Sequence, residues 1–338
     1  QRQMCIRDSV LVVDMDWHYT EPGKGGWTGW TWNRGLFPQP EKFLSYLKDN
    51  DLKVTLNLHP ADGVAAYEEK YEAIARDMGI DPQLKQTVPW VSSDKQFLKS
   101  MFKNILNPME NAGVDFWWLD WQQALYDSKV NNLSNTWWIN YAFFSYMENN
   151  SNKRPMLYHR WGGLGNHRYQ IGFSGDAVVS WKSLDYQPYF NATASNVLYG
   201  YWSHDLGGHI GNHIDPEMYV RWMQFGALSP IMRTHSQKNA NMNKEPWGFD
   251  AEYCGILRET IRQRYKMVPY IYTMARKAYD EGLSLCRPMY YDYPEHKEAY
   301  DFRKEYMFGD NMLICLLYTS DAADDRIRWL CESGNLVA

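Results

Sequence analysis

The sequence has no long hydrophobic run, no long basic run and no cysteine pattern typical of a metal site or a disulfide framework. No stretch approaches the ~18 apolar residues of a membrane helix, and the first residues lack the hydrophobic segment of a signal peptide. Its five cysteines are odd in number and lack metal-type spacing. We therefore expect neither a membrane partner nor a disulfide framework, and the sequence gives no cellular address or oligomeric state.

The chain also has little net charge. The 338 residues carry a formal net charge of −5, and lysine and arginine do not cluster, which disfavours a nucleic-acid partner. A neutral polar substrate suits this balance better. Aromatic residues are instead abundant, at 16% of the chain with 16 tryptophans. Sugar rings stack their apolar C–H faces on such side chains, although aromatics also fill protein cores.

Two aspartates follow short apolar runs that are rich in aromatic residues. Asp120 ends the segment Val-Asp-Phe-Trp-Trp-Leu-Asp at 114–120, and Asp176 ends Ile-Gly-Phe-Ser-Gly-Asp at 171–176. Each run is typical of a strand, so each carboxylate would lie at a strand's C-terminal end. Paired carboxylates among aromatic rings are the groups that cleave glycosidic bonds.

Apolar, strand-like runs alternate with amphipathic, helix-like stretches along the chain. This alternation indicates βα units and a parallel sheet in an α/β fold. The expected strands are 10–16, 53–60, 114–120, 156–160, 170–176, 197–205 and 227–235. Seven strands that mostly end in charged or imidazole side chains fit a (β/α)8 TIM barrel that lacks its first strand. A doubly wound sheet is the alternative, but it predicts a glycine-rich loop after the first strand, where the chain has Asp14-Met-Asp-Trp-His-Tyr.

Two helices have clear sequence signals in the second half of the chain. Asp215 followed by Pro216 is typical of a helix start, with a capping carboxylate and proline at the first position. A second helix is expected to run without interruption over 252–279. The apolar positions of this second helix predict packing against a barrel.

Six short motifs occur in a characteristic order. They are listed here in chain order: Asp14-Met-Asp-Trp17, Trp118-Leu-Asp120, Arg160, Ser174-Gly-Asp176, His204-Asp-Leu-Gly-Gly208 and Arg233-Thr-His235. This series resembles glycoside hydrolase family 31, a family of retaining α-glucosidases, α-xylosidases and related enzymes, over about residues 10–315. The resemblance implies a TIM barrel flanked by β-sandwich domains, here without its first strand and N-terminal sandwich. It also implies an oligosaccharide or glycoside substrate and neither a metal nor an organic cofactor.

The resemblance divides the chain into four parts. Residues 10–290 are expected to form the incomplete catalytic barrel, and 291–315 the start of a C-terminal β-sandwich. The flanking segments 1–9 and 316–338 resemble translated adapter sequence rather than protein, so we interpret both as artefacts.

The resemblance also assigns roles to individual residues. Asp120 is expected to be the catalytic nucleophile and Asp176 the catalytic general acid and base, which has to be protonated near neutral pH when it meets the leaving oxygen. For retention, their carboxyl groups should lie ~5–6 Å apart, whereas ~9 Å would favour inversion. The predicted substrate-binding residues are Asp14, Asn57, Trp118, Arg160, Phe173, Asp205, His209 and His235.

Three departures from the family's common pattern bear on the choice of sugar. Trp121-Gln122-Gln123 stands where many members have Met-Asn-Glu after the nucleophile, Asn57 and His59 stand where an aliphatic and an acidic residue are common, and His209 replaces a frequent aromatic. Such polar side chains would suit an axial hydroxyl or a 2-substituent. The hypothesis from the resemblance is an exo-acting, retaining, α-glucosidase-like enzyme. The departures make an α-galactosidase or α-N-acetylgalactosaminidase the main alternative, and an α-xylosidase is a further one.

Additional tryptophans at 27, 30 and 32 could contact the leaving group or support the rim of the pocket. A hypothesis of another class is a non-catalytic carbohydrate-binding protein on the same fold, because a fold does not guarantee activity. The presence of both aspartates together with Arg160 argues against this second class.

Overall fold

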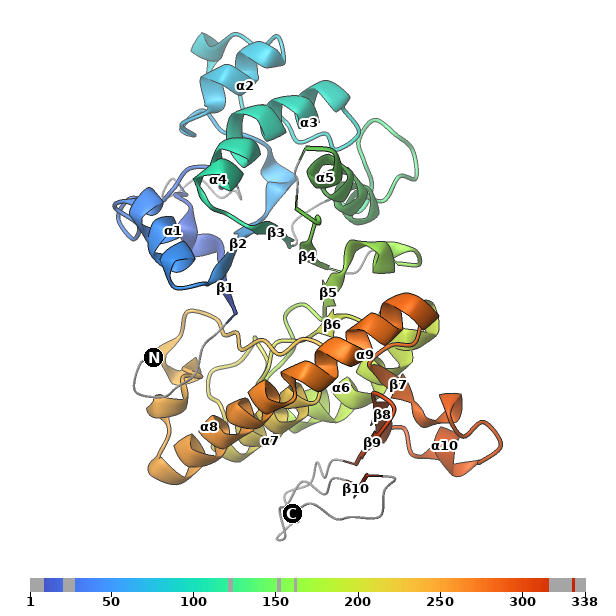
Figure 1. Cartoon of the computed structure of the whole chain (residues 1–338). Helices are drawn as coiled ribbons and strands as arrows, with labels where there is room; N and C mark the ends of the chain where they lie inside the picture. The colour runs from blue at the N-terminus through green and yellow to red at the C-terminus, as the bar shows by residue number, and fades with distance from the viewer. Residues whose placement is uncertain are drawn as a thin grey trace. The chain divides into compact units, whose positions relative to one another are not determined.

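The computed structural model describes residues 9–20, 28–120, 124–150, 153–160 and 163–315, together with the backbone of 330–331. The chain divides into two compact units. One spans Arg7–Tyr169, and the other consists mainly of Gln170–Ala338. Figure 1 shows the elements of both, and each unit is described by itself.

The Arg7–Tyr169 unit is built on four parallel strands that neighbour one another in chain order. These strands are β1 (Val10–Val13), β2 (Lys53–Leu58), β3 (Phe116–Leu119) and β4 (Leu157–Arg160). All four residues of β3 are buried, as expected for a strand of a parallel sheet whose two faces are both covered. Its C-terminal end is tied to β2, because the backbone N–H of Asp120 donates to the carbonyl of Leu58 at 3.1 Å.

Helices fill the connections between these strands. They are α1 (Pro40–Asp49), α2 (Tyr71–Asp77), α3 (Lys95–Met101), α4 (Asn107–Ala112) and α5 (Asn135–Asn150). Helix α1 begins with a proline, whose missing N–H is not needed at a helix start, and α3 is capped by the Asp94 carboxylate. This strand–helix order confirms the predicted α/β fold, a partial (β/α) TIM barrel.

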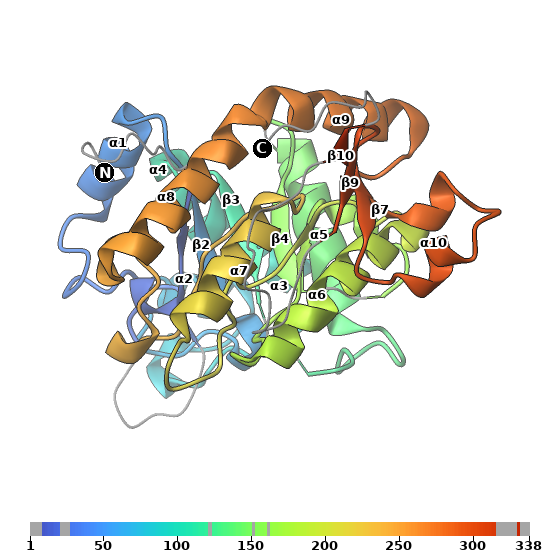
Figure 2. The same cartoon turned by 90° about the horizontal axis from the view of Figure 1, so that it is seen from below.

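The Gln170–Ala338 unit carries two further parallel strands, β5 (Ile171–Phe173) and β6 (Trp202–Ser203). Its helices are α6 (Trp181–Thr193), α7 (Pro216–Ala227), α8 (Ala251–Lys266), α9 (Val268–Glu281) and α10 (Glu298–Asp301). Helix α8 packs against α7, as both cartoon views show (Figures 1 and 2). Their contact contributes Trp222, Phe225 and Leu257 to a large apolar core.

A four-stranded sheet follows the last long helix. Strands β7 (Cys286–Pro288), β8 (Tyr306–Phe308) and β9 (Met312–Ile314) pair in antiparallel fashion, and β10 (Leu330–Cys331) joins β9. The domain boundaries predicted from the sequence stay predictions.

Two sequence-based predictions for this unit are wrong in detail. The segment 227–235 forms no ladder, because α7 runs through Ala227 and Pro230 lacks a backbone donor; one isolated parallel bridge joins Leu206 and Thr234. The helix expected over 252–279 is two helices, since α8 ends at Lys266 and α9 begins at Val268 with Pro269 in its first turn. The predicted Asp215 cap is confirmed, because its carboxylate accepts from the N–H of Glu217 at 3.1 Å.

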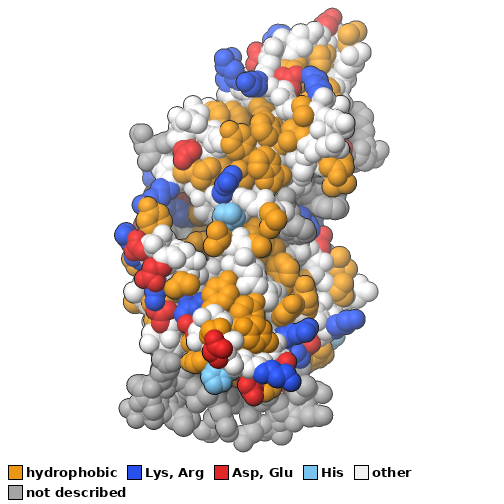
Figure 3. All heavy atoms as spheres, turned by 90° about the vertical axis from the view of Figure 1, so that its right-hand side faces the viewer, with side chains coloured by type: hydrophobic (Ala, Val, Ile, Leu, Met, Phe, Trp, Pro, Cys, Tyr) orange, Lys and Arg blue, Asp and Glu red, His pale blue; other side chains and the backbone are white. Residues whose placement is uncertain are grey.

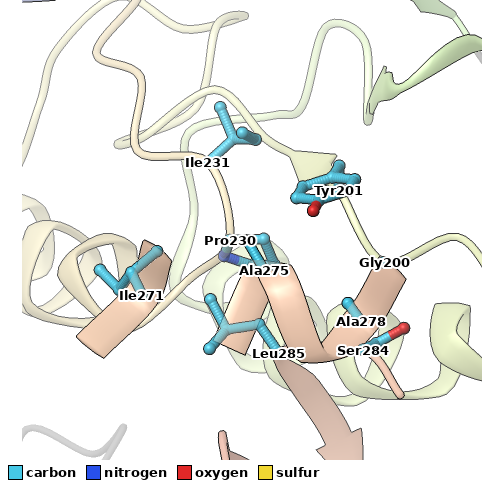
Figure 4. A pocket seen from close by; sticks show the side chains of 9 residues that line it. All are labelled: Gly200, Tyr201, Pro230, Ile231, Ile271, Ala275, Ala278, Ser284 and Leu285. Carbon is cyan, nitrogen blue, oxygen red and sulfur yellow. The ribbon is translucent and has the colours of Figure 1, made fainter. Parts of the chain in front are cut away.

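An apolar cavity of about 190 Å³ lies between α9 and the residues that precede β6 (Figure 4). Its walls include Tyr201, Ile231, Ile271, Ala275 and Leu285. Tyr201 comes before β6, whereas catalytic groups of parallel barrels follow their strands. This cavity is therefore a poor candidate for the sugar site.

Among the described residues, no helix combines the length and apolar character needed to cross a bilayer.

Candidate active site

The C-terminal ends of β2, β3 and β4 bring three predicted site residues together around the Asp120 carboxylate. Arg160 Nε donates to Asp120 Oδ1 at 2.5 Å, and Asn57 Nδ2 donates to Asp120 Oδ2 at 3.0 Å. Asp120 is only 7% exposed, so both contacts form where bulk water is largely excluded. A guanidinium and an amide that each donate to a different oxygen stabilise the ionised carboxylate and fix its orientation.

His59 is a further neighbour of this carboxylate that was not among the predicted substrate-binding residues. Its Nε2 lies 3.6 Å from Asp120 Oδ2. Asn57 and His59 are two positions apart, and side chains at this spacing lie on one face of an extended segment. This period of two was the signal that could have added His59 to the prediction.

The strand arrangement explains why Asn57 reaches Asp120. Asn57 of β2 and Trp118 of β3 are register partners, and the indole of Trp17 donates to the backbone carbonyl of Asn57 at 2.7 Å. Trp17 and Trp118 are both essentially buried. The Oδ1 atom of Asn57 is buried without a hydrogen-bond partner among the described residues, so it is an acceptor available to a ligand hydroxyl.

Asp14 lies one residue beyond β1 and is half-buried. Its Oδ1 accepts from the N–H of Met15 at 2.7 Å and so caps the short 3-10 helix Met15–Trp17. Trp30 and Trp32 are buried, with the Trp30 indole donating to the Gly63 carbonyl at 2.8 Å. These two rings therefore support the loop rather than offering an open face. Trp27, Trp121, Gln122 and Gln123 lie outside the described residues.

In the Gln170–Ala338 unit, the predicted residues Asp205, His209 and His235 form a second group. Asp205 is 1% exposed and pairs with Arg233, whose guanidinium also lies 5.5 Å from the ring centroid of Phe173. The His209 and His235 rings stack at 4.9 Å with an interplanar angle of 10°. Nδ1 of His209 is 4.0 Å from Asp205 Oδ2. Arg233 was missed by the prediction, although it is two positions before His235.

The turn after Asp205 depends on glycine. Gly207 and Gly208 have φ values of +83° and +77°, and a Cβ on Gly208 would lie 2.8 Å from the Cα of Val179. This turn places the N–H of His209 2.6 Å from the carbonyl of Ala177, the residue after Asp176. Asp176 itself is exposed, three residues beyond the end of β5.

Lys244 contacts the group formed by Asp205, His209 and His235 through backbone carbonyls. No sequence motif indicated this residue. Its buried Nζ donates to the carbonyls of Gly208 and His235. Burial lowers the pKa of Lys244 to about 7, with the nearby Arg233 acting in the same direction. Burial also lowers the pKa of His235, together with the cations Arg233 and Lys244 and the ring of His209. His235 is therefore neutral at physiological pH and can accept or donate a hydrogen bond.

One ligand atom from each of Asp205, His209 and His235 lies within 4.8 Å of the others, a spacing compatible with a metal ion. Two features oppose a cation there. The imidazole lone pairs lie in the ring planes, so two parallel stacked rings do not aim at a common point. Arg233 and Lys244 also place positive charge beside Asp205. The group suits hydrogen bonding to hydroxyls better than metal coordination.

Two fully buried histidines immediately precede site residues and predict acid sensitivity. Burial lowers the pKa of His159 to about 4 and that of His204 to about 3. In the unfolded chain these groups titrate near 6.5, so the unfolded state binds more protons below that pH and the free energy of unfolding falls as the pH decreases. At pH 5 each is expected to cost about 2 kcal/mol relative to pH 7. Urea unfolding at both pH values measures this loss.

The variant His204→Phe provides the matched test, because the ring packs between Trp222 and Phe225 and has no hydrogen-bond partner among the described residues. Its unfolding free energy should depend less on pH between 7 and 5 than that of the parent protein. An unchanged pH dependence would contradict the contribution assigned to His204.

Comparison with known proteins adds independent information. A family model described as the glycosyl hydrolases family 31 TIM-barrel domain matches residues 2–274, and one described as the glycosyl hydrolase family 31 C-terminal domain matches 282–333. An α-xylosidase of Saccharolobus solfataricus is 27% identical over 326 residues, which is 90% of this chain and 43% of that protein. Neutral α-glucosidase C of Mus musculus is 33% identical over 162 residues, or 48% of this chain and 18% of that protein.

Solved structures agree at the level of the fold. A Flavobacterium johnsoniae GH31 dextranase complexed with glucose aligns with a TM-score of 0.77 and 24% identity, covering 95% of this chain and 43% of that one. A GH31 α-xylosidase from a soil metagenome complexed with xylose gives a TM-score of 0.73 at 19% identity, over 93% of this chain and 52% of that one. The chain thus spans about half the length of the proteins it resembles, or less.

Proposed function

The chain belongs to glycoside hydrolase family 31, and on this premise we propose that it hydrolyses terminal α-linked sugars with retention of configuration. Asp120 attacks the anomeric carbon and forms a covalent glycosyl ester, while Asp176 protonates the leaving oxygen. Asp176 then removes a proton from the water that hydrolyses the ester. The observation that carries this proposal is the Asp120 carboxylate at the end of β3, which Arg160 and Asn57 hold and orient by hydrogen bonds to its two oxygens.

Arg160 acts in this proposal by stabilising negative charge on the nucleophile before attack and again when the ester breaks. An electrostatic contact that is already in place needs no reorganisation during the reaction. Trp118 is buried and lies two positions before Asp120, on the same face of the extended segment, so its ring would exclude water beside this carboxylate. The two aspartates belong to different units, and the ~5–6 Å separation of their carboxyl groups that retention requires stays a prediction.

The substrate-binding roles follow from the chemistry of the remaining groups. The free acceptor on Asn57, the Asp14 and Asp205 carboxylates and the neutral His235 ring can each bond a sugar hydroxyl. Phe173, which is buried beneath Arg233, keeps that guanidinium directed at Asp205, and His209 presents a partly exposed ring beside the same carboxylate. These groups suit a neutral, hydroxyl-rich ligand such as a glycoside or an oligosaccharide.

The sugar is proposed to be glucose-like, with a xyloside, galactoside or N-acetylgalactosaminide as the second candidate. The galactoside and the N-acetylgalactosaminide are favoured by the polar Asn57, whose side-chain Oδ1 has no protein donor among the described residues and could accept from an axial hydroxyl or a 2-substituent. An assay with the four nitrophenyl α-glycosides distinguishes them. NMR of the first-formed sugar tests retention, because a retaining enzyme releases the α-anomer first. Release of the β-anomer, or cleavage of none of the four, would contradict the proposal.

Removal of the Asn57 amide is expected to lower kcat/KM. The variant Asn57→Ala loses a charge-assisted hydrogen bond to Asp120, an interaction of roughly 1.5–3 kcal/mol, which corresponds to about 10–100-fold in rate. Steady-state kinetics on the best nitrophenyl glycoside measure this effect. Asn149→Ala is the control, because among the described residues its amide bonds the Ser145 carbonyl alone, on the exposed surface of α5. Equal activity of the two variants would remove Asn57 from the site.

A further inference from the structure

Exposed tyrosines gather on one surface of the Gln170–Ala338 unit. They come from α6 and from the segment that runs from the 3-10 helix Met289–Tyr291 to α10. Tyr186, Tyr291 and Tyr300 are 53%, 38% and 50% exposed. Figure 3 views the molecule from the side where α10 lies in Figure 1, and its hydrophobic side chains gather in this region with charged side chains at the margin. Such a patch commonly marks a binding surface.

Contacts among these side chains hold the rings in place without a ligand. The Tyr290 and Tyr300 rings stack at 5.0 Å with an interplanar angle of 11°, and Tyr291 lies 5.8 Å from Tyr290. Asn196 links the group to the end of α6, since its amide donates to the Tyr290 hydroxyl at 2.7 Å and accepts from the Tyr291 hydroxyl at 3.0 Å. Rings that are already fixed lose little conformational entropy when a ligand binds.

Several charged groups beside the tyrosines are paired with one another or with a ring. Lys304 pairs with Asp185, and Lys297 lies 3.6 Å from Asp301. The Arg303 guanidinium lies 5.8 Å from the Tyr189 ring centroid, so its charge faces an aromatic ring. A surface with paired charges and oriented rings does not favour a strongly charged partner. It matches a neutral sugar chain, whose C–H faces stack on tyrosine and whose hydroxyls bond the phenol and amide groups.

We propose that this tyrosine surface, formed by Tyr186, Tyr189, Asn196, Tyr290, Tyr291 and Tyr300, is a second binding site for neutral oligosaccharide or polysaccharide chains. It uses none of the residues assigned to the catalytic pocket, and it performs no chemistry. The choice of a sugar ligand rests on the proposed glycosidase function. Binding there would raise the local concentration of chain ends available for cleavage.

Affinity electrophoresis tests the proposal without requiring turnover. Native gels that contain soluble starch, dextran or xyloglucan are run with the parent protein and with the variant Tyr291→Ala/Tyr300→Ala, which leaves Tyr290 and its Asn196 contact in place. The parent protein should be retarded by at least one polysaccharide. The double variant should bind that polysaccharide about tenfold more weakly, because two stacking rings are lost.

The matched control is Tyr272→Ala/Tyr279→Ala, which removes two tyrosines of α9 that are 77% and 81% exposed. It should migrate like the parent protein in every gel. Equal retardation of both double variants, or no retardation of the parent by any of the three polysaccharides, would overturn the proposal. A change in oligomeric state on substitution of Tyr291 and Tyr300 would instead identify the surface as a protein interface.

Failure of the proposed function is separable from failure of this site. Retardation that depends on Tyr291 and Tyr300 but accompanies no glycosidase activity would contradict the catalytic role of Asp120 and leave the tyrosine surface supported. Full glycosidase activity without retardation would support the catalytic assignment and contradict the tyrosine surface as a binding site. Thermal unfolding of each variant confirms that it folds, which is expected because the replaced rings are exposed.

Discussion

Replacement of Asp120 by alanine is expected to reduce kcat by roughly five orders of magnitude, because the covalent step then has no nucleophile. The donor groups of Arg160 and Asn57 would then have no carboxylate to bond. Steady-state kinetics with the best nitrophenyl α-glycoside measure the loss. Asp115→Ala is the matched control, since Asp115 lies just before β3, binds the Val54 N–H and pairs with Lys53.

Added azide sharpens this test. A small anion can enter the space left by the Asp120 side chain and attack the anomeric carbon from the same face, which yields a glycosyl azide of inverted configuration. Partial rescue with that product would support the assigned role. Near-normal turnover of Asp120→Ala without azide would be incompatible with it.

Replacement of Asp176 by alanine is expected to have the second largest effect, and the size should depend on the leaving group. A sugar leaving group needs a proton, so its cleavage should fall by about 10²–10⁴-fold, whereas a nitrophenolate leaves without protonation and should be affected less in the first step. The second step loses its general base, so the glycosyl ester should accumulate. A burst of nitrophenol followed by slow turnover is the expected pre-steady-state result.

Asp280→Ala is a suitable control for this variant, because Asp280 is an exposed residue of α9 that, among the described residues, pairs with Arg276 on the same helix. It should leave both classes of substrate unaffected. If Asp176→Ala loses the same factor in rate with nitrophenyl and sugar leaving groups, Asp176 binds substrate or supports the structure of the pocket rather than transferring a proton.

The strand ends could be predicted because each combines an apolar run with a terminal polar residue. Asp120 after Phe-Trp-Trp-Leu and Arg160 after Leu-Tyr-His follow this rule, and both lie at the ends of their strands. The partial barrel follows from the alternation of such runs with helices. The order of the motifs, more than any one of them, identified the family.

Other features depend on contacts between segments that are far apart in the sequence. Asn57 was expected to meet the sugar, but its amide donates to Asp120, a residue 63 positions away, and only its carbonyl oxygen remains available. Lys244 lies in a polar segment with no periodic signal, yet it holds the carbonyls of Gly208 and His235. Pro269 is a helix breaker inside the segment 252–279, for which an uninterrupted helix was expected. In the structure a new helix begins there, with Pro269 in its first turn.

The most direct test of the account is to trap the covalent intermediate. The protein is incubated with a fluorinated glycosyl fluoride that forms the ester quickly and hydrolyses slowly, and the digested product is analysed by mass spectrometry. If Asp120 is the nucleophile, we expect one sugar per protein, attached to Asp120 in the peptide that contains Trp118. A label on any other residue, or hydrolysis to the inverted sugar without a label, would contradict it.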